Sequence, residues 1–60
     1  MDNYYGKLAR SVLMKAQADV SEAQNHLVEA DAPDWMYMRL KKIMSSLRNL
    51  HDGIGATLDS

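Results

Sequence analysis

The side chains that could act as nucleophiles in this sequence include serines but no cysteine, and four of the five serines lie in the interior of the chain. All four fall within stretches of helical periodicity, where serine hydroxyls usually face water or bond back to the helix. None stands at a sharp turn between a strand and a helix, and the glycines at 53–56 have no preceding strand to form a phosphate-binding loop. We therefore expect no enzyme. These four serines are Ser11, Ser21, Ser45 and Ser46.

The two histidines are the only strong nitrogen ligands for a metal ion. Two are too few for a structural site unless carboxylates or a second chain contribute. If the chain folds back on itself, His26 and His51 lie at opposite ends, about 20 Å apart at 1.5 Å per residue. A dimer could combine them with Asp19 or Glu22, but solvated or interface-flanking histidines explain the pattern better. We expect neither a metal nor a cofactor.

Seven basic and eight acidic residues give a formal charge of -1. This balance argues against a general nucleic-acid binder, whose affinity depends on clustered positive charge. In a dimer, however, the basic residues could form one positive face. A regulatory hairpin dimer that binds nucleic acid is therefore the alternative function. The basic residues are Arg39, Lys41, Lys42 and Arg48 in the second half of the chain, with Lys7, Arg10 and Lys15 in the first.

The elements that position these side chains follow from two heptad-like rhythms, with apolar residues alternately three and four apart, which predict helices. The first consists of Ala9, Leu13, Ala16, Val20, Ala23, Leu27 and Ala30. The second consists of Met36, Leu40, Ile43, Leu47, Leu50 and Ile54.

The segment between the two rhythms contains the only proline and predicts a turn. Proline is tolerated in a first helical turn, and Asp31 followed by Asp34 resembles a capping box for a new helix. We expect a first helix over about 3–30, a turn at 31–33 and a second helix over about 34–52. Gly53 could end this helix, or a weakened helix could continue to 57.

A short connection forces the two helices to run antiparallel, so we predict an all-α, two-helix hairpin forming a single domain over 1–60. Folding at the turn brings small residues of the first helix opposite large residues of the second, as close packing requires. The predicted layers pair Leu27 with Met36, Ala23 with Leu40, Val20 with Ile43, Ala16 with Leu47, Leu13 with Leu50, and Ala9 with Ile54.

A hairpin of this size has a marginal core, and without cysteine the chain cannot use disulfides. Self-association is the remaining support, so we expect a homodimer in the form of a four-helix bundle. A second apolar stripe recurs every seven residues and is expected to form the dimer interface or to bind a different protein; it comprises Tyr37, Met44, His51 and Leu58. Both parallel and antiparallel dimers are compatible with the sequence.

Aromatic and methionine side chains outside the predicted seam are candidates for binding a partner protein, since such residues suit adaptable interfaces. They are Trp35, Tyr37, Met38 and Met44, followed by Tyr4 and Tyr5. We expect a stoichiometric inhibitor, adaptor or co-chaperone, of the kind found among phage accessory and secretion proteins. With no span of ~20 apolar residues and no signal-like N-terminus, we expect it in the cytoplasm, without membrane contact.

Overall fold

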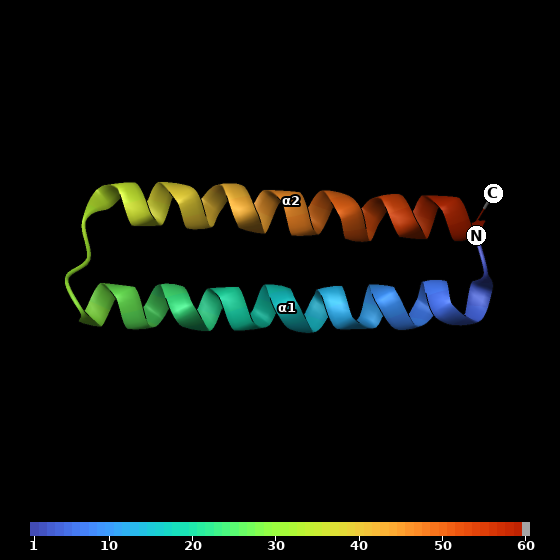
Figure 1. Cartoon of the computed structure of the whole chain (residues 1–60), viewed down its shortest axis with the longest axis horizontal. Coiled ribbons are helices and arrows are strands. Elements are labelled where there is room, and N and C mark those ends of the chain that lie inside the picture. The colour runs from blue at the N-terminus through green and yellow to red at the C-terminus, as the bar shows by residue number, and fades with distance from the viewer. Residues whose placement is uncertain (60) are drawn as a thin grey trace.

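The protein consists of two long helices joined by a short turn, in a computed structural model that describes residues 1–59. Helix α1 spans Asn3–Glu29 and helix α2 spans Asp34–Asp59. The helices lie antiparallel and side by side, so that both chain ends come to the same end of the molecule (Figure 1). The hairpin measures 43 × 15 × 10 Å. The predicted all-α hairpin is confirmed.

The N-terminus of α1 is capped by Asp2. Its carboxylate accepts a hydrogen bond of 2.8 Å from the backbone N–H of Tyr5, which would otherwise lack a partner in the first turn. The backbone carbonyl of Asp2 accepts a second bond, from the N–H of Gly6. The helix therefore starts where the sequence pattern predicts.

The turn is closed by Asp31, whose backbone has a φ of 56°. The N–H of Asp31 donates to the carbonyl of Val28, and that of Ala32 donates to the carbonyl of Leu27, both at 3.1 Å. These two bonds around a left-handed residue form a Schellman motif. Asp31 therefore ends the first helix, whereas the sequence pattern predicted that it would cap the second.

Helix α2 continues through Gly53 instead of ending at Asp52. The residues beyond Gly53 pack against α1: Ile54 is 8% exposed, and Leu58 lies over Gly6. A Cβ at Gly6 would come within 2.8 Å of the Leu58 side chain, so only glycine permits this approach. Packing outweighs the poor helix propensity of glycine here.

The predicted layers of small against large residues agree with the observed burial on α2 and only in part on α1. Leu40 and Leu47 are half-buried and Ile54 is buried, whereas Ala16 is half-buried and Ala9 and Ala23 are exposed. Small residues on one helix allow the other helix to approach closely.

Leu27 and Met36 are both half-buried as predicted, but the other two layers differ from the prediction, because Ile43 and Leu50 are 49% and 55% exposed. Their expected places are taken by a stripe of half-buried residues, Tyr37, Met44, His51 and Leu58. This stripe was expected on an outer flank and instead lies inside the hairpin. The stripe is held at both ends, because the Tyr37 hydroxyl donates to the Leu27 carbonyl and Leu58 packs on Gly6.

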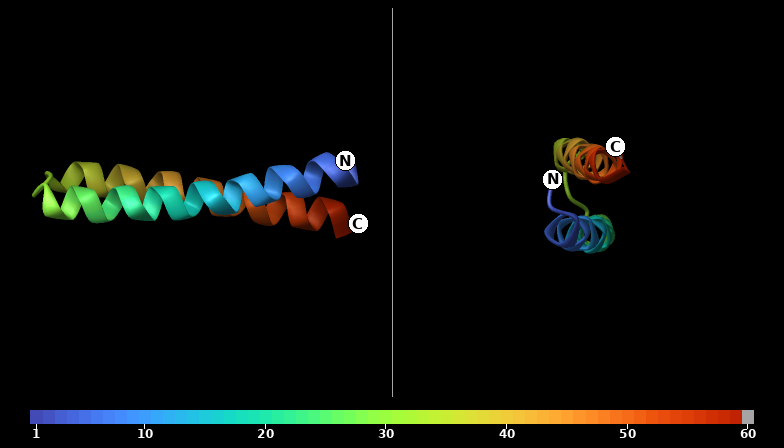
Figure 2. Two further views of the ribbon diagram at one scale, coloured as in Figure 1. Left: turned by 90° about the horizontal axis from the view of Figure 1, so that it is seen from below. Right: turned by 90° about the vertical axis from the view of Figure 1, so that its right-hand side faces the viewer.

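The core that results is narrow. Ile54 is the only buried large apolar side chain within the described residues, and none among them is fully enclosed. Figure 2 shows the reason: two helices cross each other gently and form two layers, so every core residue is close to solvent on both sides.

Candidate protein-binding surface

The turn end of the hairpin presents two large apolar side chains to solvent. Trp35 and Met38, in the first turns of α2, are 55% and 64% exposed. The guanidinium carbon of Arg39 lies 5.6 Å from the centroid of the Trp35 ring, a cation–π distance that supports the indole on one face. A partly supported, exposed indole is typical of a residue that anchors a binding partner.

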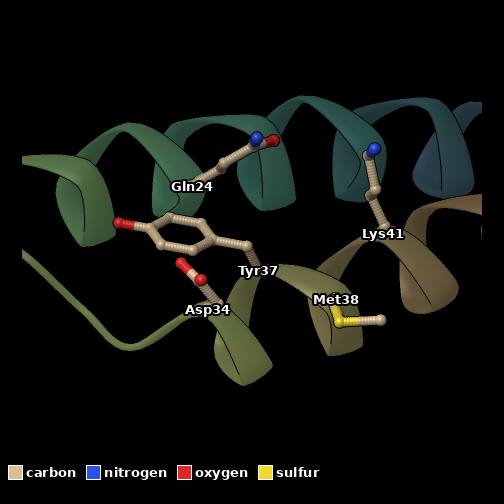
Figure 3. Close-up of a pocket in the computed structure, with 5 residues that line it drawn as sticks. All are labelled: Gln24, Asp34, Tyr37, Met38 and Lys41. Atoms are coloured by element: carbon tan, nitrogen blue, oxygen red, sulfur yellow. The ribbon is translucent and has the colours of Figure 1, made fainter.

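An open pocket lies beside Met38, between the two helices. Gln24 of α1 lines it, together with Asp34, Tyr37, Met38 and Lys41 of α2. Figure 3 shows the Tyr37 ring crossing toward α1, with the Asp34 carboxylate beside it. Its volume of about 330 Å³ is at the lower end of the range for small-molecule sites.

The Tyr37 ring lines this pocket, and its hydroxyl is held in place by a hydrogen bond. It donates a 2.9 Å hydrogen bond to the carbonyl of Leu27, which also accepts from the N–H of Ala32. The Tyr37 hydroxyl is a second donor to this carbonyl, and it ties α2 to α1. Tyr37 thus has a structural role within the hairpin.

Tyr4 and Tyr5 lie at the opposite end of the hairpin, close to the chain termini. Their rings are 5.1 Å apart at 78°, an edge-to-face pair, and the residues are 66% and 69% exposed. Because α1 is 27 residues long, this pair and Trp35 are separated by most of the length of the molecule. They cannot contribute to one contiguous site within a single chain.

The six predicted binding residues are therefore divided among three environments. Trp35 and Met38 are exposed at the turn end, and the two N-terminal tyrosines are exposed at the other. Tyr37 and Met44 are half-buried between the helices. Binding of a partner by any of the six stays a prediction.

Sequence reasoning missed two exposed apolar residues, Ile43 and Leu50, because it placed them in the hairpin core. The sequence pattern included Leu58 in the Tyr37 stripe but left open whether the helix continues past Gly53; the continuation to Asp59 brings Leu58 onto α1 and makes this stripe the inner face. When the Tyr37 stripe faces α1, Ile43 and Leu50 lie to one side of the contact between the two helices.

The histidines are separated, as the folded-back chain predicts. His26 lies 3.8 Å from Glu22, one turn away on α1. His51 lies between the helices, where its ring accepts a 3.4 Å hydrogen bond from Arg10 and approaches Asp52 at 3.2 Å. Across residues 1–59, no cluster of three or more His, Asp or Glu side chains is arranged to hold a metal ion.

The basic residues of α2 do not share one face. Lys41 and Arg48 are seven residues apart, so they lie on the same edge of α2, and Lys41 lines the pocket. Arg39 lies over Trp35. Arg10 of α1 lies beside the edge of α2 that carries Lys41 and Arg48, because its side chain lies against Gly55, seven residues beyond Arg48.

Neither α1 nor α2, as far as the chain is described, has a stretch apolar enough to cross a lipid bilayer. No protein-family model, curated protein or solved structure matches the chain. Its candidate function is therefore argued from its surface alone.

Proposed function

We propose that the protein is a non-enzymatic module that binds another protein stoichiometrically, as an inhibitor, adaptor or co-chaperone, and that it works as a pair of hairpins. The observation that carries this proposal is the exposure of Trp35 and Met38 beside the open pocket. Large apolar side chains that remain exposed after a fold is complete commonly mark interaction sites. The absence of cysteine is compatible with a reducing compartment such as the cytoplasm.

The turn-end surface has the chemistry of a protein-binding site. Tryptophan is among the residues most enriched at binding hot spots, and methionine adapts its shape to different partners. The pocket adds polar groups of both signs, from Asp34 and Lys41, at its rim. Such a combination suits a partner helix or loop that inserts one apolar side chain beside Tyr37 and places polar groups around it.

The test is capture of binding partners from cells of the native host, followed by titration calorimetry with the purified partner. We expect a 1:1 ratio of partner to hairpin, and Trp35→Ala should weaken binding at least tenfold, as expected for a hot-spot tryptophan. Lys42→Ala, seven residues further along the same face, is the matched control and should bind normally. The proposal fails if Trp35→Ala and Met38→Ala both bind every captured protein as well as the unchanged chain does.

The alternative function is nucleic-acid binding. It is favoured by the position of Arg10, Lys41 and Arg48 along one edge of the hairpin. A nucleic-acid complex should weaken steeply as salt concentration rises and should lose affinity when Lys41 is neutralised. Binding of structured RNA or duplex DNA that shows both properties would favour this alternative over the protein-binding module.

A further inference from the structure

An apolar strip runs along one side of the hairpin, half-buried at Met36 and exposed beyond it. On α2 it consists of Met36, Ile43 and Leu50, which are seven residues apart and therefore share an edge of the helix. Ile43 and Leu50 are 49% and 55% exposed, and Val12 on α1 is 66% exposed. We call these four residues the Ile43 flank.

The Ile43 flank lies opposite the pocket. Arg10 of α1 lies against Gly55 of α2, which shows that these two helix edges meet on one side of the hairpin. Gln24 and Lys41 follow the same two edges at intervals of seven residues and line the pocket together. That side is the Lys41 flank.

The other edges of the two helices face the opposite side. Ile43 lies three residues after Leu40 and four before Leu47, on the side of the inner stripe away from Lys41. On α1, Val12 likewise lies three residues after the small residue Ala9 and four before Ala16. Val12 and the α2 members of the Ile43 flank therefore share one side of the hairpin.

The surface area of the hairpin indicates what could cover this flank. One chain of 6.8 kDa exposes 4778 Å². Folded monomers of this mass expose about 4,000 Å², and those of twice the mass about 6,600 Å². Two separate hairpins expose about 9,600 Å², so a pair with a surface typical of its mass would bury roughly 3,000 Å² in total. That lies within the range of about 2,000–5,000 Å² for obligate homodimers.

Charge selects the Ile43 flank over the Lys41 flank for pairing. Pairing through the Lys41 flank would remove from water the charges that it carries, which are Asp34 and Lys41 at the pocket together with Arg10 and Arg48. The four members of the Ile43 flank are all uncharged. The formal charge of the whole chain is only -1, so two copies do not repel each other strongly.

We infer that a second copy of the chain packs on the Ile43 flank, so that Ile43 and Leu50 of both copies enter the shared core of a four-helix bundle. This inference rests on the pairing of hairpins in the proposed function and assigns the surface that produces it. The pocket and Met38 lie on the opposite side and stay accessible, so each pair presents two partner sites.

The test is sedimentation equilibrium of the full chain over a wide concentration range. The unchanged chain should be a dimer, and Ile43→Gln and Leu50→Gln should each weaken dimerisation about tenfold or more, since each removes an apolar side chain from both copies. Val28→Gln is the matched control: Val28 is an apolar residue of α1, 58% exposed and outside the flank. This variant should dimerise normally.

A second readout keeps the test valid if a glutamine variant loses its fold. The chain has no cysteine, so Ile43→Cys and Val28→Cys each introduce a single thiol. A short bismaleimide cross-linker should join Ile43→Cys chains into covalent dimers and leave Val28→Cys chains single.

The outcomes test three claims separately: that the Ile43 flank is the pairing surface, that two hairpins pair, and that a different protein binds through Trp35. A dimer that the Ile43 and Leu50 substitutions leave intact, or that cross-links through Val28→Cys, would overturn the assigned surface and leave the pairing in place. A monomer at every concentration would overturn both. A monomer whose Ile43 flank becomes protected only when a different protein binds would also overturn both the assigned surface and the pairing. Binding of that protein through Trp35 is measured independently.

Discussion

Tyr37 shows how one residue can resemble a binding group in the sequence and serve the fold instead. Its hydroxyl closes the gap between the end of α1 and the start of α2 by bonding the Leu27 carbonyl. The aromatic ring then becomes the floor of the pocket. A tyrosine meets both needs because it combines an apolar ring with a polar tip.

Removing only the Tyr37 hydroxyl should destabilise the hairpin without changing its shape. We expect Tyr37→Phe to lower the free energy of unfolding by about 1 kcal/mol, the net contribution of one hydrogen bond. Urea unfolding followed by circular dichroism at a fixed protein concentration measures the change. Tyr4→Phe, at the exposed N-terminal end, is the control and should have little effect. An equal loss in both variants would contradict the structural role of the Tyr37 hydroxyl.

At the scale of elements, the turn depends on one backbone conformation. Asp31 holds a positive φ, which glycine adopts without strain and which aspartate tolerates better than branched residues do. The two hydrogen bonds that end α1 require this conformation. The position of α2 relative to α1 therefore depends on the conformation of residue 31.

Substitutions at Asp31 should separate this role from helix capping. We expect Asp31→Gly to raise the free energy of unfolding by up to about 1 kcal/mol and Asp31→Val to lower it by about 1 kcal/mol or more. Thermal unfolding of the two variants at matched concentration checks both signs. If Asp31 instead capped α2, glycine would give no gain, and a loss on Asp31→Gly would contradict the Schellman geometry.

The sequence predicted the helices and their direction because those depend on local signals, which are the apolar periodicity and the break at Pro33. It did not predict which of two adjacent stripes on α2 faces α1. One candidate is the row of Met36, Ile43 and Leu50, and the other is the Tyr37 stripe, which also contains Met44, His51 and Leu58. Both rows flank Leu40 and Leu47, and His51 makes the Tyr37 stripe less apolar. The choice depends on contacts distant in the sequence, Leu58 on Gly6 and Tyr37 on Leu27.

The candidate site was predicted in part for the same reason. Trp35 and Met38 lie near the turn and are exposed. A small rotation of α2 that exchanges Ile43 and Met44 at the contact with α1 would leave both of them exposed. Met44 and Ile43 lie in the middle of the helix, and the rotation exchanges their environments. Periodicity alone could not distinguish an inner stripe from an outer one when both are apolar.

At the scale of the whole molecule, the hairpin separates two surfaces by the side on which they lie. The Ile43 flank is uncharged and is the surface proposed for a second copy, while the Lys41 flank holds the pocket together with Lys41 and Arg10. A pair of hairpins can therefore form without covering the surface proposed for the partner. Pairing would also supply the burial that the narrow core of one hairpin lacks.

The most direct measurement of this arrangement is an isotope-filtered NOE spectrum of a mixed sample, in which half of the chains carry labelled methyl groups. Contacts between chains are then separated from contacts within a chain. We predict intermolecular NOEs from the methyl groups of Ile43 and Leu50, and only intramolecular NOEs from Met44 to α1. Intermolecular NOEs from Met44, with Ile43 contacting only α1 of its own chain, would contradict the account.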